Sequence, residues 1–309
     1  MIVTFTPNPA VDKTLLVPAL RVGGVNRARE AHLDPGGKGI NASRVVRRLG
    51  RDTVALTVLG GHIGRMLQEA LASEDVACDA VWVGDETRLN VIVQDEASGA
   101  STRVWDRGAA VPGSARDDVQ ALIDRWLPRA KVFACAGTVP PGLPGDAYVA
   151  ILEAAARAGA KTLLDADGDA FRIGLAGRPT VIKPNVREAE SVLGRKLATE
   201  REVIDGAVEL LRRGPEAVVV SMGAAGSILV TADVVVRAVP PQVTRLSAVG
   251  SGDSLVAGLL VALAEDLPME EGLRLGTAAG AATAMTVGTQ LGTRDEIEAL
   301  LPHVRIDRL

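Results

Sequence analysis

Short β-branched segments alternate with stretches of helical length along most of the chain, and this alternation constrains the fold more than any other feature. We expect strands at 2–6, 53–58, 132–136, 162–165, 181–183 and 217–221, and helices at about 39–49, 64–73, 145–158, 186–194 and 200–213. Strands and helices that alternate in this way form a mainly parallel sheet with helices on both faces. The sequence therefore predicts one doubly wound α/β domain over residues 1–309, with a ligand site beyond the carboxyl ends of its strands.

Two segments, 12–33 and 81–107, depart from this alternation because they carry strand-like patterns and no helix. The second contains a predicted hairpin turn at 95–99. Together the two segments predict a small β-sheet beside the main domain, where it would serve as a lid or a dimer contact. The alternative is a pair of edge hairpins of the main sheet.

Composition limits the classes of partner. The 309 residues are 47% hydrophobic, which is enough for a substantial core, and the net charge of −4 provides no basic surface for nucleic acid. The longest apolar runs, such as 255–264, are too short to cross a membrane. Since the chain has only Cys78 and Cys135 and its first residues do not resemble a targeting segment, we expect a cytoplasmic protein.

A glycine-rich turn directly precedes the apolar run at 255–264. Gly250 and Gly252 allow the backbone N–H groups around Ser251 to converge at a helix N-terminus, where a phosphate would be stabilised. Asp253 lies at the same point and could take a proton from a hydroxyl that attacks this phosphate. Alternatively, Asp253 is only the N-cap of the helix.

Polar residues near the start of the chain suggest a second half of the site. In Pro-Gly-Gly-Lys-Gly-Ile-Asn at 35–41, Lys38 could meet an anionic group and Asn41 could bind sugar hydroxyls, although an ordinary tight turn explains the glycines equally well. The spacing does not fit a nucleotide-binding P-loop. Asp12 follows the first predicted strand, where it could accept from two sugar hydroxyls or be a solvated turn residue.

Two later segments could contact a nucleotide and its metal ion. Asn185 and Glu188 follow Lys183 and fall on one face of the first helical turn, so they could reach Mg²⁺ through its waters, but they also match a capping box. The turn at 221–226, which includes Ser221, Gly223 and Gly226, could lie against an adenine or ribose, or be a plain hairpin.

In chain order, these motifs resemble the ribokinase-like superfamily, specifically its phosphofructokinase B branch. The resemblance rests on Thr-Pro-Asn-Pro-Ala-Val-Asp at 6–12, the motif at 35–41, Lys-Pro-Asn-x-x-Glu at 183–188 and Gly-x-Gly-Asp at 250–253, and it extends to about residue 292. The first two motifs look most like those of fructose-1-phosphate kinase and tagatose-6-phosphate kinase. The sequence departs from the family at Ser251, where Ala is commoner.

The resemblance implies an ATP-dependent sugar-phosphate kinase with Asp253 as general base. The backbone amides of Gly250, Ser251, Gly252 and Asp253 would stabilise the transferred phosphoryl group. The sugar would be held by Asp12, Gly37 and Asn41, and its resident phosphate by Lys38, Arg88, Arg103 and Thr138.

The resemblance further implies Mg²⁺ near Asn185 and Glu188, with a monovalent cation as another candidate cofactor. ATP would contact Lys183, Ser221, Gly223, Gly226 and Gly252. Fructose 1-phosphate is the favoured acceptor, tagatose 6-phosphate and fructose 6-phosphate are the alternatives, and a non-catalytic sugar-phosphate sensor is the alternative of a different class. The small sheet is expected to join two subunits into a homodimer.

Overall fold

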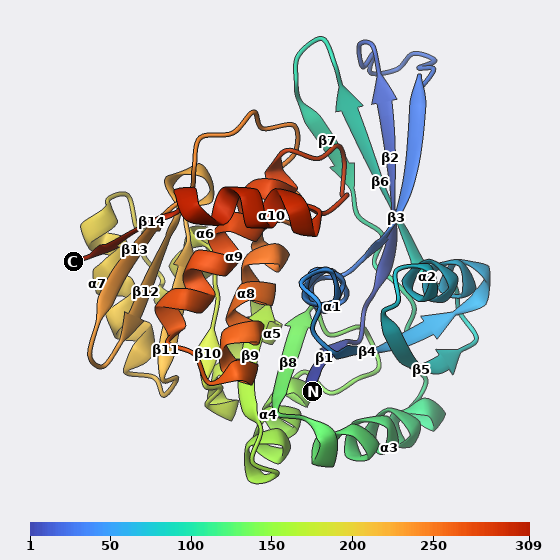
Figure 1. Ribbon diagram of the computed structural model, residues 1–309. Helices are drawn as coiled ribbons and strands as arrows, with labels where there is room; N and C mark the ends of the chain where they lie inside the picture. Colours follow the sequence, from blue (N-terminus) through green and yellow to red (C-terminus); the bar gives the residue numbers. More distant parts are fainter.

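A large sheet forms the centre of the computed structural model, which describes residues 1–309 (Figure 1). Its strands are β1 (Ile2–Thr6), β4 (Thr53–Gly60), β5 (Ala77–Val83), β8 (Val132–Gly137), β9 (Lys161–Ala166), β10 (Val181–Ile182), β11 (Ala217–Ser221), β12 (Ser227–Thr231), β13 (Val235–Val239) and β14 (Arg305–Arg308). They lie in the order β14-β13-β12-β11-β10-β9-β8-β1-β4-β5. From β11 to β5 all neighbours are parallel, while β12, β13 and β14 pair antiparallel at the other edge. The predicted doubly wound, mainly parallel sheet is confirmed.

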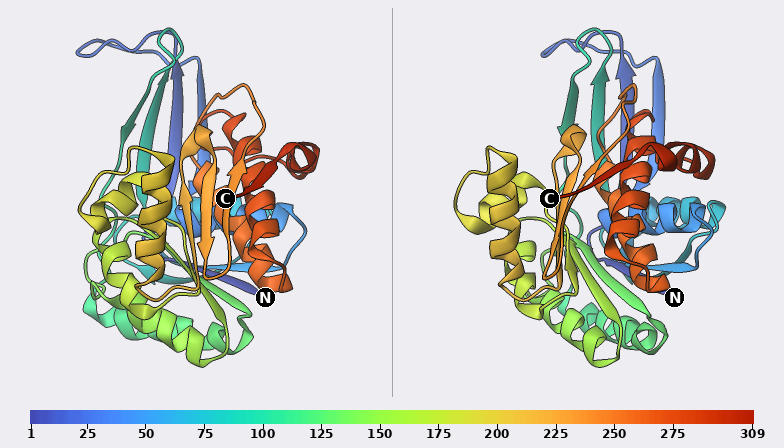
Figure 2. Two further views of the ribbon diagram at one scale, coloured as in Figure 1. Left: turned by 90° about the vertical axis from the view of Figure 1, so that its left-hand side faces the viewer. Right: turned by 60° about the vertical axis from the view of Figure 1, so that its left-hand side comes forward.

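Helices cover both faces of this sheet (Figure 2). They are α1 (Lys38–Arg48), α2 (Gly61–Ser73), α3 (Arg116–Trp126), α4 (Ala147–Arg157), α5 (Gly168–Gly174), α6 (Val186–Leu193), α7 (Glu200–Leu211), α8 (Ser251–Glu265), α9 (Met269–Ala284) and α10 (Arg294–Leu300). The five helices expected in the first 213 residues correspond to α1, α2, α4, α6 and α7. No helix combines the length and the apolar composition that a membrane crossing requires.

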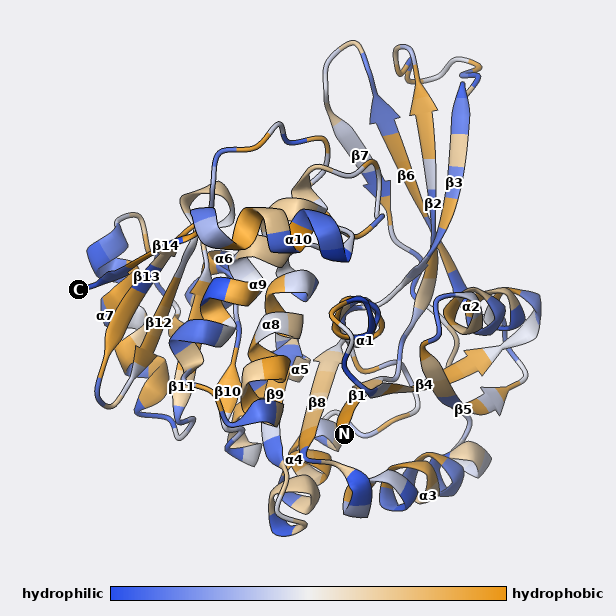
Figure 3. Cartoon of the chain, viewed as in Figure 1, coloured by the Kyte–Doolittle hydropathy of each residue, from blue (hydrophilic) through white to orange (hydrophobic).

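The strands feed two separate cores because their side chains alternate between the faces of the sheet. In β8, Phe133 and Cys135 pack into the cluster that contains Leu152 of α4. Val132 and Ala134 instead join the cluster on the opposite face, which includes much of α8. Burial on both sides explains why hydrophobic colour predominates in central strands such as β4 and β8 (Figure 3).

A second, small sheet projects beside the main one (Figure 1). Its strands are β2 (Ala10–Val17), β3 (Glu30–Gly36), β6 (Arg88–Asp95) and β7 (Ser101–Val104), in the order β3-β2-β6-β7. The alternative of two edge hairpins of the main sheet is therefore wrong. Two boundaries also need correction, because residues 81–83 belong to β5 of the main sheet and the first projecting strand begins at Ala10.

The connectivity places a crevice next to β1. After β1 the chain builds outward through β4 and β5, and then returns to β8 on the other side of β1. In open α/β sheets such a reversal of direction leaves a crevice at the carboxyl ends of the strands, and ligands bind there.

Candidate active site

A cavity of about 1730 Å³ opens at this crevice, bordered by the small sheet and by the N-terminus of α8. Every residue that the sequence singled out for a site lines it: Asp12, Gly37, Lys38, Asn41, Arg88, Arg103, Thr138, Lys183, Asn185, Glu188, Ser221, Gly223, Gly226, Gly250, Ser251, Gly252 and Asp253. The sequence therefore identified residues from distant parts of the chain that face a single space.

The N-terminus of α8 has the form expected of an anion-binding turn. Gly250 is the N-cap, with φ 82° and ψ −14°, and no side chain caps the helix. The N–H of Ser254 bonds to the Gly250 carbonyl, so the preceding amides of residues 251–253 have no acceptor within the helix. The interpretation of Asp253 as the N-cap is therefore wrong, and its carboxylate is available for another role.

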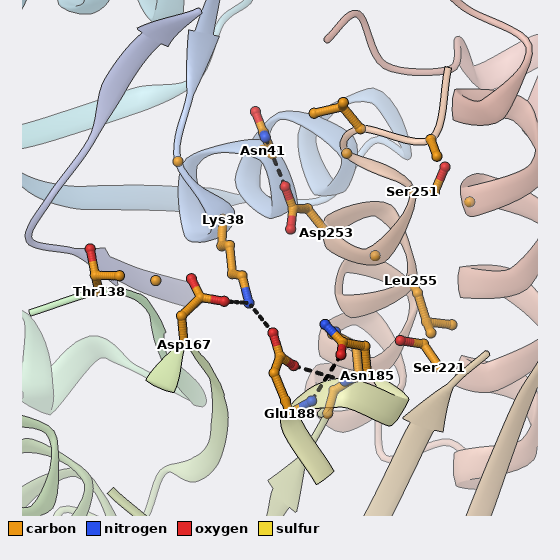
Figure 4. A pocket seen from close by; sticks show the side chains of 18 of the residues that line it. Lys38, Asn41, Thr138, Asp167, Asn185, Glu188, Ser221, Ser251, Asp253 and Leu255 are labelled. Carbon is orange, nitrogen blue, oxygen red and sulfur yellow. Dashed lines mark hydrogen bonds and ion pairs between the residues drawn. The ribbon is translucent and has the colours of Figure 1, made fainter. Parts of the chain in front are cut away.

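Asp253 contacts the early glycine-rich loop directly. Asn41 Nδ2 donates to Asp253 Oδ2 at 2.8 Å (Figure 4). Burial and the nearby Asp165 carboxylate raise the pKa of Asp253 to about 7. This increase persists although the Asn41 bond, Lys38 and Lys183 act to lower the pKa. A carboxylate with this pKa can accept a proton near neutral pH.

The glycines of the early loop are required by its close packing on the ends of the central strands. Gly37 has φ 117°, and a Cβ there would lie 2.9 Å from Thr6 Cγ2. A Cβ on Gly39 would lie 3.2 Å from the Ala136 Cβ. This close approach brings Lys38 and Asn41 to the floor of the cavity, so the glycines serve more than an ordinary tight turn.

Lys38 lies among three carboxylates. Its Nζ is 2.8 Å from Asp167 and 3.3 Å from Glu188 (Figure 4). The same nitrogen is 3.0 Å from Asp165. Burial opposes the charged ammonium, but the three carboxylates outweigh it and raise the pKa of Lys38 well above its ordinary value. Without ligands, Lys38 is thus an ion-paired cation between the two ends of the cavity.

Asn185 and Glu188 form the capping box of α6. The Asn185 side chain accepts from the Glu188 N–H at 3.0 Å, and Glu188 Oε2 accepts from the Asn185 N–H at 2.8 Å. Both residues also line the cavity, so they can cap the helix and still face a ligand there.

The same region has the chemistry of a weak Mg²⁺ site. Asp165 Oδ2 is buried without a hydrogen-bond partner, and burial raises the pKa of Glu188, so both carboxylates lack full compensation. His, Cys, Asp and Glu nowhere form a preassembled group of three metal ligands. Oxygen donors without such a group fit Mg²⁺, which keeps several waters and binds mainly through one or two carboxylates and substrate phosphates.

Asp12 lies at the side of the cavity formed by the small sheet. It belongs to β2 and is buried, so the solvated-turn interpretation is wrong. Asn90 is its register partner on β6 and donates to Asp12 Oδ1 at 2.8 Å. Burial raises the pKa of Asp12, although the Asn90 bond and Arg88 oppose this effect.

The predicted phosphate ligands differ in how far they are already engaged. Arg88 donates to the carbonyls of Asn8, Pro9 and Asp106, and the Thr138 hydroxyl accepts from Asn8 Nδ2 at 2.9 Å. Arg103 lines the cavity from β7 and makes no side-chain hydrogen bond or ion pair. Among the four predicted phosphate ligands, Arg103 is therefore the cation that has no partner, as is also true of Arg107 and Arg245 elsewhere in the cavity lining.

The predicted nucleotide side of the cavity is formed by two strand ends. Residues 223–225 form a 3₁₀ turn between β11 and β12, which pair antiparallel, so the hairpin interpretation is confirmed. Ser221, Gly223 and Gly226 also line the cavity. Lys183 follows β10, is buried, and lies 3.3 Å from Asp165.

The polar residues that sequence reasoning missed include Asn90 and Asp167, which line the cavity, and Asp165, which pairs with Lys38 and Lys183 beside it. Asp165 and Asp167 end β9 and follow it, at the same sheet edge as the predicted site, so their position after a predicted strand was an available signal. Asn90 could be found only from its register with Asp12 across β2 and β6.

Comparisons with known proteins agree with this geometry. The family model for pfkB family carbohydrate kinase matches residues 6–296. The chain is 34% identical to 1-phosphofructokinase of Bacillus subtilis, over 100% of both chains, and 32% identical to ATP-dependent 6-phosphofructokinase isozyme 2 of Escherichia coli, over 98% of both. A crystal structure of phosphofructokinase-2 from Escherichia coli, in complex with substrates and products, superposes with a TM-score of 0.91 at 32% identity and covers 98% of each chain. The chain belongs to the pfkB family of carbohydrate kinases and is a phosphotransferase that acts on a sugar hydroxyl.

Proposed function

We propose that the protein transfers the γ-phosphoryl group of ATP to fructose 1-phosphate and forms fructose 1,6-bisphosphate. The observation that carries this proposal is the 2.8 Å contact between Asn41 and Asp253, which joins the sugar-side loop to the base at the anion-binding turn. The relative named 1-phosphofructokinase supports the choice of acceptor. Fructose 6-phosphate and tagatose 6-phosphate are the competing acceptors.

In the proposed reaction, the hydroxyl oxygen of the sugar bonds to the γ-phosphorus of ATP and ADP leaves. Asp253 accepts the proton that this hydroxyl loses. The free amides of residues 251–253 stabilise the charge on the transferred phosphoryl group. Asp12, held by Asn90, binds sugar hydroxyls from the opposite side. The acceptor is thus oriented between the Asp253 carboxylate, which Asn41 holds, and the Asp12 carboxylate, which Asn90 holds.

The cofactor assignments belong to the same proposal. Asn185, Glu188 and Asp165 would hold Mg²⁺, largely through water, and the ion would neutralise the donor phosphates. Lys183 and the turn at 221–226 would bind ATP. A monovalent cation is a further candidate because a structure of Escherichia coli phosphofructokinase-2 is a complex with potassium.

The resident phosphate of the acceptor would be bound by Arg103 together with Arg88, Thr138 and Lys38. Arg103 is assigned the main ionic contact because it is exposed to the cavity and unpaired, whereas Lys38 is surrounded by carboxylates. Arg88 is already bound to three carbonyls and would mainly shape the pocket.

A homodimer through the small sheet is also proposed, in a cytoplasmic protein. Asp12, Asn90 and Arg103 point to the cavity, so the neighbouring residues of each strand point to the opposite face. Two cross-strand rows on that opposite face contain a single charged residue: Leu33, Lys13, Val91 and Val104, and then Ala31, Leu15, Val93 and Thr102. A half-exposed apolar face of this kind is typical of a protein contact.

The test is an ADP-release assay with ATP, Mg²⁺ and each of the three ketohexose phosphates. The proposal requires fructose 1-phosphate to have the highest kcat/KM. Asp253→Ala is expected to lower kcat by roughly 10²–10⁴-fold while sugar-phosphate binding is mostly retained. A protein that binds fructose 1-phosphate without releasing ADP would instead be a non-catalytic sensor, and near-normal turnover by Asp253→Ala would remove the role given to this residue.

A further inference from the structure

Arg44 is a buried charged residue that does not line the cavity. It lies on α1 and is 3% exposed. Its Nε and Nη2 donate to Glu74 Oε1 at 3.0 and 2.6 Å, which compensates the buried charge. Its remaining nitrogen, Nη1, points the other way, toward the glycine-rich loop.

Arg44 Nη1 makes two contacts with this loop. It donates to the Pro35 carbonyl at 2.9 Å and to Asn41 Oδ1 at 3.4 Å. The other end of the same amide, Asn41 Nδ2, donates to Asp253 Oδ2. Arg44, Asn41 and Asp253 therefore form a continuous chain of hydrogen bonds from the buried interior to the cavity.

This chain is compatible with only one orientation of the Asn41 amide. If the amide turned by half a revolution, its oxygen would face the Asp253 carboxylate and its NH₂ group would face the guanidinium. An amide oxygen cannot donate to a carboxylate, and a guanidinium cannot accept. The guanidinium thus selects the orientation in which Asn41 donates to Asp253.

We infer that Arg44 is a positioning residue for phosphoryl transfer, which acts through Asn41 to orient and hold the Asp253 carboxylate. The inference rests on the proposed role of Asp253 as the base. The buried ion pair with Glu74 holds the guanidinium so that its Nη1 faces the glycine-rich loop.

Loss of Arg44 would also change the ionisation of Asp253. The charged groups that face Asp253 are Asp165 from β9, Lys38 from α1 and Lys183 from the end of β10. None of these is removed when Arg44 is replaced. The Asn41 bond lowers the pKa of Asp253, so a freely turning Asn41 leaves this pKa above its present value of about 7.

The test compares Arg44→Met with Arg48→Met. Arg48 is on the same helix and pairs with the same Glu74, at 3.0 Å, but it bonds to the carbonyls of Leu291 and Gly292 and not to Asn41. The first measurement is the NMR signal of the Asn41 side-chain NH₂ between pH 5 and 9 without ligands, identified by its absence in Asn41→Ala. The second is the pH dependence of kcat.

In the wild type and in Arg48→Met, the Asn41 signal should titrate with Asp253. In Arg44→Met, the Asn41 signal should move toward that of a solvated amide. The apparent pKa of the acid limb in the pH profile of kcat should rise by about one unit, which lowers kcat at pH 7 about fivefold. Arg44→Lys should behave in the same way. Lysine keeps a positive charge beside Glu74, but its single nitrogen leaves no donor for Asn41. This variant decides the test if Arg44→Met does not fold.

An unchanged Asn41 signal in a folded Arg44 variant would overturn the inference, and so would an equal change in Arg48→Met. The NMR measurement needs no substrate. A failure of the inference therefore differs from a failure of the proposed function, which would appear as a wild-type protein that releases no ADP.

Discussion

The ionisation of Asp253 links its proposed role as the base to the stability of the fold. The pKa of Asp253 is about 7 in the folded protein, against an ordinary value of 3.8. The free energy of unfolding therefore falls as the pH rises from 3.8 to about 7, and this loss of stability stays constant at higher pH. Asp253→Asn should therefore raise the melting temperature by roughly 6 °C at pH 8, and by much less at pH 5. Calorimetry at the two pH values measures this difference.

Asp266→Asn is the matched control, because Lys131 and Lys161 lower the pKa of Asp266 to about 2. Its ionised form stabilises the fold over the whole range from pH 5 to 8, so the substitution should lower the melting temperature equally at both values. A loss of stability at pH 8 in Asp253→Asn would contradict the strained ionisation inferred for the wild type.

At the level of residues, the sequence could predict which side chains face the site but not which of them touch. Asp253 was recognisable from Gly-Ser-Gly-Asp, while its contact with Asn41 joins residues 212 positions apart. The exclusion of Asp253 as the N-cap depended on the backbone of Gly250, which no spacing reveals. Long-range pairs of this kind follow from the strand order and need the tertiary structure.

Helix α8 carries the proposed anion-binding turn, and its close packing on α9 holds this turn in place. A Cβ on Gly258 would collide with the backbone of Gly276, so the two helices meet without side chains between them. Gly258→Ala should therefore lower the free energy of unfolding by about 1–3 kcal/mol, because overpacking forces the helices apart. Denaturant titration measures the loss. Gly84→Ala, where an added Cβ meets nothing within 4 Å, should have little effect, and a neutral Gly258→Ala would show that the helices can separate freely.

Elements with strong periodicity or clear end signals were predictable, and weakly marked ones were not. The expected helices at 186–194 and 200–213 match α6 and α7, which both begin with capping boxes. The short helices α5 and α10 have only seven residues each, too few to show a helical period. Strands β13 and β14 were missed because they form an antiparallel edge that the βα alternation does not predict.

At the scale of the whole molecule, the two sheets contribute different residues to the site. The main sheet and α8 supply the proposed base and the proposed phosphate-binding turn, while the small sheet supplies Asp12 and Arg103. The sequence predicted the small sheet from its lack of helices, but it could not show that polar residues occupy one face and apolar residues the other. That division follows from the register of its four strands.

The apolar face of the small sheet leads to a prediction about assembly. Leu33 is 51% exposed and Val104 is 61% exposed, at opposite ends of one cross-strand row. If a second subunit covers this row, light scattering after size exclusion should give about twice the chain mass of 32.0 kDa, and Leu33→Glu should give the single mass, because a buried unpaired carboxylate is costly. Leu267→Glu, at an exposed site after α8, should leave the dimer intact. A dimer that persists in Leu33→Glu would place the subunit contact elsewhere, whereas dissociation without unfolding would show that the face opposite Asp12 is the one that the partner covers.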